Sequence, residues 1–469
     1  MSSTVRPTEL QGQLKTRQVT MISIAGIIGA GLFIGSAKAI ATVGPAVLIS
    51  YAFTGLLVLL VMRMLGEMAV AQPDSGSFST YADRAIGKWA GFTIGWLYWW
   101  FWVLVIPVEA IAGGAIINSW LPSLPVWLVS LAIVVVLALT NLLSVKGFGE
   151  FEFWFALVKV VAIIAFIALG LAAVFGLLPV PEVGGVERLV SNGGFAPNGM
   201  GAIVGGVLIT AFSFFGAEIV TIAAAESRDP QRQITRATNL VVWRIAIFYL
   251  LSIFLVVSLV DWNDPRLVEV GTFQRALEVL EIPAAKLIVD LVVLVAVTSC
   301  MNSGLYTASR MLFSLGRRGD APSAVTRLSL QGVPRVAVLT STLIGILACL
   351  ANFLFPGQVF DTLLATTGAV ALLVYLVISV SQIRLRRALE AKGERPELRM
   401  WLFPGLSYLT VAALVLVLGY MAWAPAFRAE AVMTAAVGAL VLAAGLINSG
   451  RRERVERASN GHRVGVEHR

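Results

Sequence analysis

Long apolar segments are the feature that most constrains the fold of this chain. A helix needs about 20 apolar residues to cross a bilayer core. Hydrophobic residues make up 58% of the sequence and charged residues only 13%, too few charges to cover a soluble protein of 469 residues. The sequence predicts an all-α membrane protein with twelve transmembrane helices. The expected spans are 19–41, 45–70, 92–119, 125–144, 152–177, 200–224, 238–260, 285–312, 336–355, 360–381, 402–423 and 430–448.

The positive charges are distributed unevenly among the segments between these spans. Cytoplasmic segments of membrane proteins carry an excess of Lys and Arg, and this pattern predicts that both termini are cytoplasmic. The runs at 384–387 and 451–457 are typical of orientation and headgroup contact. Because no single basic patch forms, nucleic-acid binding is not expected. With that orientation only six of the 35 Lys and Arg are outward: Lys38, Arg188, Arg266, Arg275, Lys286 and Arg428.

Residues that carry redox, metal or hydrolytic chemistry are sparse. Cys300 and Cys349 lie inside apolar stretches without disulfide or metal-ligand spacing, and His462 and His468 both lie in the tail. Neither a nucleotide-binding loop nor a nucleophile–base pair is present in the sequence. We therefore expect no cofactor, no metal and no enzymatic activity. The first 18 residues are polar, so a cleavable signal peptide is not expected either.

The first span contains four glycines within ten residues. Residues 25–35 read AGIIGAGLFIG, and each interior glycine costs a helix roughly 0.5–1 kcal/mol relative to alanine. Close helix packing through small residues is one explanation, but Gly26, Gly29 and Gly31 point in different directions. The pattern favours an unwound turn near the bilayer midplane, where freed amide N–H groups can bind a carboxylate.

The sixth span has a matching irregularity. Residues 211–218 read AFSFFGAE and place Ser213, Gly216 and Glu218 inside an apolar run. A carboxylate at this depth should face a cavity or a partner. Spans one and six occupy equivalent places if spans 1–5 and 6–10 form inverted repeats. Two interrupted spans at corresponding places indicate a transporter site.

Two further charged residues lie within predicted spans. Lys159 in the fifth span is either a structural cation, paired or snorkelling, or a functional one, which is a proton carrier or a fixed cation replacing a sodium ion. Glu109 in the third span, after Pro107, either binds the substrate ammonium, carries the coupled proton or bonds a neighbouring helix. Together with Glu218, these residues are the candidates for proton coupling.

The eighth span carries polar residues at helical spacing. The residues Ser299, Asn302, Tyr306, Arg310 and Arg317 fall on one face, which indicates either the inner half of a substrate path or a polar seam between helices. The aromatic stretch GWLYWWFW at 95–102 is consistent with either an interfacial belt or the wall of an apolar pocket.

Several motifs resemble the amino acid transporter family of the amino acid–polyamine–organocation superfamily. The resemblance runs from about residue 14 to 400 and implies a leucine-transporter-type fold of 5+5 inverted repeats plus two C-terminal helices. The implied organisation is an N-terminal tail at 1–18, repeats at 19–177 and 199–382, two helices at 402–448 and a tail at 449–469. The motifs are PDSGSFSTYA at 73–82, AGIIGAGLF in span one, FSFFGAEIVTIAAAES in span six, TSCMNSGLYTASRML in span eight and RRGDAP at 317–322.

This resemblance also implies positions for the substrate. The carboxylate of the substrate would meet the amides of Gly29, Ala30 and Gly31 at the break of span one. An α-amine would meet the carbonyls of Ile27, Phe212 and Phe215.

The same resemblance assigns a gate and a fixed charge. Phe212 occupies the position of the gating aromatic residue, and Lys159 matches the residue that replaces the ion of sodium-coupled relatives. The resemblance is strongest to members that carry 4-aminobutyrate, whose amine lies on the γ-carbon. Glu109 is then the expected acceptor for the more distant amine.

The function implied is proton-coupled import of 4-aminobutyrate by alternating access in a bacterial cytoplasmic membrane. The alternative substrate is another small amino acid, such as β-alanine, proline or an aromatic amino acid. A channel is the alternative of another class, and it would need a continuous polar pore. The expected partners are thus a small zwitterionic amino acid, a proton and the lipid bilayer.

Overall fold

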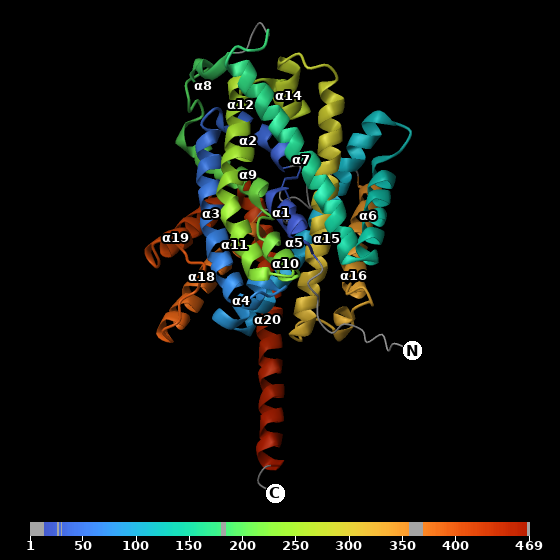
Figure 1. Ribbon diagram of the computed structural model, residues 1–469, viewed down its shortest axis with the longest axis vertical. Coiled ribbons are helices and arrows are strands. Elements are labelled where there is room, and N and C mark those ends of the chain that lie inside the picture. The colour runs from blue at the N-terminus through green and yellow to red at the C-terminus, as the bar shows by residue number, and fades with distance from the viewer. Residues whose placement is uncertain (1–13, 26–27, 30, 180–183, 356–368, 467–469) are drawn as a thin grey trace.

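The computed structural model describes residues 14–25, 28–29, 31–179, 184–355 and 369–466, without the side chains of residues 25, 34, 212 and 451–466. It is a bundle of helices (Figure 1). Within the described residues, extended pairing is limited to one isolated bridge between Leu14 and Ser227. The all-helical fold predicted from the apolar segments is therefore confirmed.

The helices of the first half of the chain include an interrupted first element. They are α1 (Thr16–Ala25), the π-helix η1 (Gly31–Gly35), α2 (Ser36–Val43), α3 (Val47–Ala71), α4 (Ser77–Ala85), α5 (Lys88–Trp120), α6 (Val126–Leu143), α7 (Val145–Val174), η2 (Gly185–Glu187) and α8 (Arg188–Ser191).

The second half begins with another interrupted element and ends with the longest helix. Its elements are α9 (Gly199–Phe214), α10 (Ile219–Ala225), α11 (Pro230–Arg244), the π-helix η3 (Ile245–Leu251), α12 (Ser252–Leu259), α13 (Pro265–Val270), α14 (Thr272–Val279), α15 (Ala285–Arg317), η4 (Ser323–Thr326), α16 (Arg335–Leu354), α18 (Val370–Ala391), α19 (Gly405–Trp423) and α20 (Pro425–Val466).

Nine helices in the described part of the chain are long and apolar enough to cross a membrane. The first and sixth predicted spans are not among them, because each is divided into shorter helices. The predicted span 360–381 lies partly outside the described residues. A count of twelve spans and the division into two repeats of five remain predictions.

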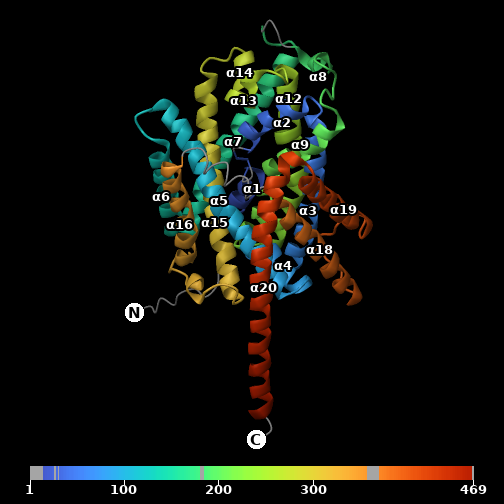
Figure 2. The same ribbon diagram turned by 180° about the vertical axis from the view of Figure 1, so that it is seen from behind.

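Four predicted boundaries differ markedly from the observed helices. The seventh span was expected to begin at 238 and the tenth to end at 381, but α11 begins at Pro230 and α18 continues to Ala391. The fifth span was expected to begin at residue 152, but α7 begins at Val145, where the side chain of Ser144 accepts a hydrogen bond from the Gly147 N–H and caps the helix. The last span was expected to end at 448, but α20 continues to Val466. Figure 2 shows α20 running along the bundle and continuing past its lower end.

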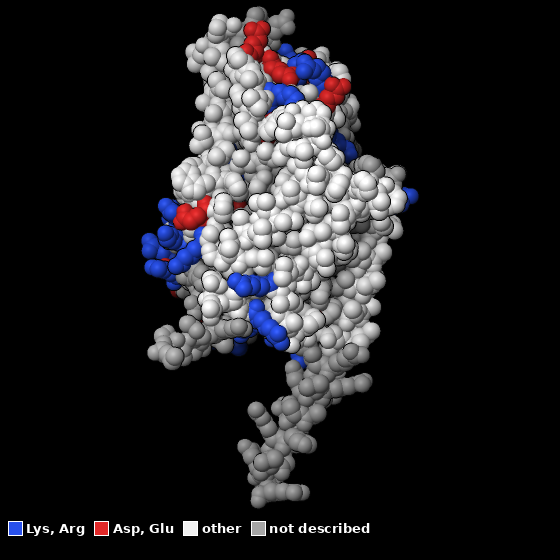
Figure 3. All heavy atoms as spheres, turned by 90° about the vertical axis from the view of Figure 1, so that its right-hand side faces the viewer, with Lys and Arg blue, Asp and Glu red and all other residues white. Residues whose placement is uncertain are grey.

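The outer surface of the bundle is suited to lipid. Figure 3 shows a broad uncharged area on one face, with acidic and basic side chains together near the upper end and basic side chains below. Large apolar side chains are exposed on the peripheral helices, including Val136, Leu139 and Leu143 of α6 and Leu347 of α16. Contiguous exposed apolar surface of this kind marks a membrane contact. The chain is a multi-pass membrane protein.

The two long helices α5 and α15 pack against each other through the middle of the bundle. Gly304 of α15 permits their close approach, because a Cβ atom at this position would lie 2.7 Å from Cε3 of Trp102. Both Gly304 and Trp102 are buried. This contact holds α15 in place against the aromatic residues of α5.

The close contact at Gly304 gives a first prediction. Alanine at this position is expected to destabilise the protein by about 1–3 kcal/mol, because the added methyl group overpacks the helix contact. Thermal unfolding of the purified protein in detergent measures the effect. Gly419 of α19 is the matched control, since a Cβ atom there meets no atom within 4 Å. Equal unfolding temperatures for Gly304→Ala and Gly419→Ala would contradict the prediction.

Candidate functional site

The first span is broken where the glycine-rich sequence predicts. Helix α1 ends at Ala25, the described residues Ile28 and Gly29 are not helical, and the π-helix η1 begins at Gly31. The carbonyl oxygen of Ile28 accepts a hydrogen bond from Lys159 Nζ at 3.1 Å, and that of Gly31 accepts one from Ser213 Oγ at 3.0 Å. Side chains thus satisfy backbone groups that a continuous helix would bond internally.

Gly29 brings the break close to two neighbouring helices. A Cβ atom on Gly29 would lie 3.3 Å from Glu109 Oε1 of α5 and 3.4 Å from Cβ and Sγ of Cys300 on α15. Glu109 is buried. Its carboxylate therefore lies against the unwound segment, and its role in binding the substrate stays a prediction. Ile27 and Ala30, the other residues predicted to contact substrate here, lie outside the described residues.

The sixth span is also broken where the sequence predicts. Helix α9 ends at Phe214 and α10 begins at Ile219, with Gly216 between them at a φ of 103°, a conformation that favours glycine. Freed carbonyl groups are again bonded by side chains, because the Tyr249 hydroxyl donates to the Ser213 oxygen at 2.9 Å. The break is a stable turn with specific partners.

Glu218 lies in this second break and is fully buried. Its Oε1 accepts a hydrogen bond from the Tyr98 hydroxyl at 2.8 Å, and its Oε2 accepts one from the Gly216 N–H at 3.1 Å. The carboxylate thus faces partners, one of the two situations expected for it. It joins α5 to the turn between α9 and α10.

The two breaks lie side by side near the middle of the bundle. Element η1 packs against α9, and α1 packs against α10. The Ser213–Gly31 hydrogen bond joins them directly. In Figure 1, α1, α9 and α10 lie together inside the ring of longer helices. The sequence predicted both breaks, and the structure brings them together.

Aromatic side chains of α5 pack against the second break. The ring of Phe215 lies 4.2 Å from Phe101, 6.0 Å from Tyr98 and 6.3 Å from Trp102, measured between ring centroids. Tyr98, Phe101 and Trp102 are buried, so these members of the 95–102 stretch form an internal wall and not an interfacial belt. The side chain of Phe212, the predicted gate, is outside the described part of the structure.

Lys159 is fully buried beside the first break. Besides Ile28, its ammonium group donates to Ser299 Oγ at 2.8 Å. Ser299 in turn donates to Glu152 Oε1, and Asn302 Nδ2 donates to Glu152 Oε2 at 3.3 Å. Glu152 is not among the residues predicted from the sequence, because the fifth span was expected to begin there. Its spacing of seven residues from Lys159 places both on one face of a helix and could have revealed it.

The polar stripe on α15 packs in a closed seam. Ser299, Asn302, Tyr306 and Arg310 are all buried. The Tyr306 ring stacks on Phe148 of α7 at 4.0 Å, and Arg310 Nε donates to Glu226 Oε1 at 3.0 Å. The predicted inner pathway is therefore occupied by side-chain contacts in this conformation.

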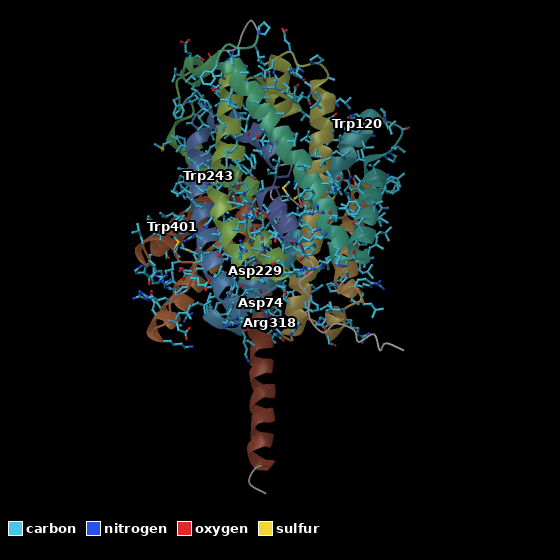
Figure 4. The ribbon with its side chains drawn as sticks, viewed as in Figure 1. Asp74, Trp120, Asp229, Trp243, Arg318 and Trp401 are labelled. Atoms are coloured by element: carbon cyan, nitrogen blue, oxygen red, sulfur yellow. The ribbon has the colours of Figure 1, made fainter. Side chains whose placement is uncertain are left out.

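A polar cavity of about 530 Å³ lies beyond this seam. Its lining includes Asp74, Arg84, Glu226 and Arg318. Figure 4 shows Asp74 and Arg318 near each other at the lower end of the bundle. Because Glu226 both lines the cavity and binds Arg310, this ion pair lies between the cavity and the seam.

The Arg310–Glu226 pair gives a second prediction. Arg310→Gln would leave a buried carboxylate without its counter-charge, and breaking a buried pair costs about 3–5 kcal/mol. The variant is expected to lower the thermal unfolding temperature in detergent markedly. Arg317→Gln is the control, because Arg317 lies two turns further on the same helix and is exposed. Similar stability of the two variants would show that the buried pair does not stabilise this conformation.

A solved structure shows the same fold at low sequence similarity. A crystal structure of a mutant manganese transporter from Eremococcus coleocola matches with a TM-score of 0.59 and 14% identity, over 95% of this chain and 99% of that chain. At this identity the match concerns the fold alone. In the described residues, no group of three or more His, Cys, Asp or Glu could hold a metal ion.

Proteins found by sequence comparison are much more similar to this chain, with identities of up to 60%. The chain is 60% identical over 451 residues to a "Probable GABA permease" of Pseudomonas aeruginosa, covering 96% of this chain and 95% of the relative. It is 58% identical over 434 residues to the "Gamma-aminobutyric acid permease" of Escherichia coli, covering 92% of this chain and 93% of the relative. It is also 40% identical to an "Aromatic amino acid transport protein" of Corynebacterium glutamicum, covering 92% of this chain and 93% of the relative. The sequence model "Amino acid permease" matches residues 18–456. The chain belongs to the amino acid permease family.

Proposed function

We propose that the protein imports 4-aminobutyrate together with protons by alternating access across the bacterial cytoplasmic membrane, with both termini cytoplasmic. The names of the relatives at 60%, 58% and 50% identity support 4-aminobutyrate as the substrate. The relative at 40% identity, named for aromatic amino acids, makes such an amino acid the competing candidate. A competition panel separates these substrates.

One observation carries the proposal: the two broken spans meet beside a buried carboxylate. Amides at a helix break bind a carboxylate well, and a buried acid suits an ammonium group. We assign the substrate carboxylate to Gly29, Ala30 and Gly31 and its ammonium to Glu109. In this assignment a 4-aminobutyrate molecule would bridge the first break and Glu109 of α5.

Further contacts complete the proposed substrate site. Ile27, Phe212 and Phe215 border the substrate, and Phe212 gates the outer path. Phe215 suits this role because it is held against the aromatic wall of α5. An apolar wall with a few convergent polar groups is typical of small-molecule sites.

The proposed proton coupling depends on Lys159, Glu109 and Glu218. The ammonium group of Lys159 has three N–H donors and holds the Ile28 oxygen at the break. Loss of a proton would weaken this bond and free the first span to move. Protonation of Lys159 would thus select between two arrangements of α1.

Alternating access requires the inner seam to open. Ser299, Asn302, Tyr306 and Arg310 would line the inner path once the Arg310–Glu226 pair separates. Because a ligand that binds all states equally shifts none of them, the substrate must bind the occluded state best. Substrate and proton would together favour the closing of the outer path.

Uptake of labelled 4-aminobutyrate into proteoliposomes tests the proposal. Saturable uptake that is stimulated by an acidic exterior, and counterflow without a gradient, are expected. Uptake that does not change with the pH gradient would reject proton coupling. Flux that does not saturate and shows no counterflow would favour a channel. Stronger competition by an aromatic amino acid than by β-alanine or proline would instead assign the aromatic substrate.

A further inference from the structure

Three buried side chains form an oriented hydrogen-bond chain that leads away from the first break. Lys159 Nζ donates to Ser299 Oγ at 2.8 Å, and the Ser299 hydroxyl donates to Glu152 Oε1. A hydroxyl group carries one proton, so a serine that accepts from an ammonium group and donates to a carboxylate has a fixed orientation. The chain therefore runs in one direction, from the lysine to the glutamate.

The surroundings hold the carboxylate of Glu152 in place. Its Oε2 accepts from Asn302 Nδ2 at 3.3 Å, and Asn302 Oδ1 accepts from Asn141 Nδ2 at 2.8 Å. The second bond fixes the Asn302 amide so that its NH₂ group points at Glu152. Both oxygens of Glu152 thus accept hydrogen bonds, which hold the carboxylate in one orientation.

All three members of the chain are fully buried. A buried ammonium and a buried carboxylate are each costly, and they compensate each other only when linked closely. Ser299 supplies that link between two residues of the same helix, α7. Proton transfer along the chain would turn the charged pair into a neutral pair, which suits a low-dielectric interior.

Other titratable groups lie around the hydrogen-bond chain of Lys159, Ser299 and Glu152. Glu109 and Cys300 are the other titratable groups that act electrostatically on Lys159. Helices α6 and α12, which pack against α7, contain no titratable residue. Other elements packed against α7 also carry titratable residues. Arg17 of α1 is bonded to Glu150. The others are Glu187 of η2, Tyr249 of η3, and Lys286, Asp290, Cys300, Tyr306, Arg310 and Arg317 of α15.

We propose that Glu152 is the inner acceptor of a proton relay that runs from Lys159 through Ser299, an inference that rests on the proposed proton coupling. One Nζ–H bond of Lys159 breaks as its proton moves to Ser299 Oγ, and the original hydroxyl proton of Ser299 moves to Glu152 Oε1. The products are a neutral amine, an unchanged serine and a carboxylic acid, so atoms and charge balance.

The relay links proton movement to the position of the first span. Lys159 without its proton holds the Ile28 oxygen less strongly, while the proton is stored on Glu152. Glu152 lies nearer the start of α7 than Lys159 does, and Glu150 beside it binds Arg17 at the start of α1. In the proposed orientation this end faces the cytoplasm, so the relay carries the proton inward.

The test compares pH-gradient-driven accumulation with counterflow in proteoliposomes. Glu152→Gln keeps the shape of the side chain but cannot take up a proton. It is expected to reduce accumulation about tenfold more than it reduces counterflow, and to flatten the pH profile of accumulation. Glu152→Asp, which keeps a carboxylate, should restore part of the accumulation and part of its pH dependence. Ser299→Ala, which interrupts the relay, should behave like Glu152→Gln, whereas Ser299→Thr, which keeps a hydroxyl, should retain more accumulation.

The matched control is Glu150→Gln, which lies two residues away on α7 with a half-buried side chain and should leave both assays unchanged. Wild-type uptake that ignores the gradient would reject the proposed function and the relay with it. Gradient-driven wild-type uptake with equal accumulation by Glu152→Gln would overturn the relay alone. Equal losses of accumulation and counterflow would assign Glu152 a structural role and also overturn it. If Glu152→Gln does not fold, the Ser299→Ala and Ser299→Thr pair decides by the same criteria.

Discussion

Lys159→Ala is expected to reduce gradient-driven uptake of 4-aminobutyrate by about a hundredfold or more. The substitution removes the donor to the Ile28 oxygen at the break and leaves Glu152 buried without its counter-charge. Losing one partner of a buried pair costs about 3–5 kcal/mol, and each 1.4 kcal/mol corresponds to tenfold. Initial uptake rates in proteoliposomes, normalised to the amount of inserted protein, measure the effect.

Two further variants make this test specific. Lys159→Arg keeps the charge, but a guanidinium group does not give up a proton in proteins, so it should not restore gradient-driven uptake. Lys146→Ala removes an exposed lysine from the start of the same helix and should transport normally. Unimpaired uptake by Lys159→Ala would remove this lysine from the mechanism.

Substitutions at Gly29 are expected to reduce uptake, and a larger side chain is expected to reduce it more. A Cβ atom there already comes within 3.3 Å of Glu109 Oε1, so alanine would crowd the break and leucine would fill it. We expect a loss of about tenfold for Gly29→Ala and about a hundredfold or more for Gly29→Leu, because added volume displaces the substrate as well as straining the contact. Uptake and binding of labelled 4-aminobutyrate are measured together.

The control for this series lies in the same span. A Cβ atom on Gly35 meets no atom within 4 Å, so Gly35→Ala should retain uptake. If Gly29→Leu transports as well as Gly35→Ala does, the substrate does not occupy the space beside the first break. A variant that loses transport but keeps its unfolding temperature would separate lost binding from lost folding.

Both breaks could be predicted because their causes are local. Glycines at positions 29 and 31 weaken one helix, and Gly216 with a nearby carboxylate interrupts the other. Such effects act over a few residues and are visible in a single sequence. Their corresponding places in the chain then indicated that the two breaks belong to one transporter site.

The partners of the buried charges could not be predicted in the same way. Glu218 binds Tyr98, which lies 120 residues away, and Arg310 binds Glu226, which lies 84 residues away. Such pairs depend on how helices pack, and periodicity within one helix does not specify its neighbours. The sequence located these charges on helices but not the bonds between them.

Glu152 was missed for a different reason. Hydropathy placed the start of the fifth span at this residue, which suggested a carboxylate near the membrane surface. Helix α7 begins at Val145, so Glu152 lies two turns inside the helix and is buried against α15. Helix boundaries are the least reliable part of such predictions, and here the boundary decided whether a charge belonged to the site.

Under the proposed proton coupling, the bond between Lys159 and the Ile28 oxygen has a physiological consequence. A cation that is covalently part of the protein cannot dissociate or be diluted, so no dissolved salt is needed to fill its place. The rate of nutrient capture is then expected to be the same in sodium, potassium or choline media of equal pH.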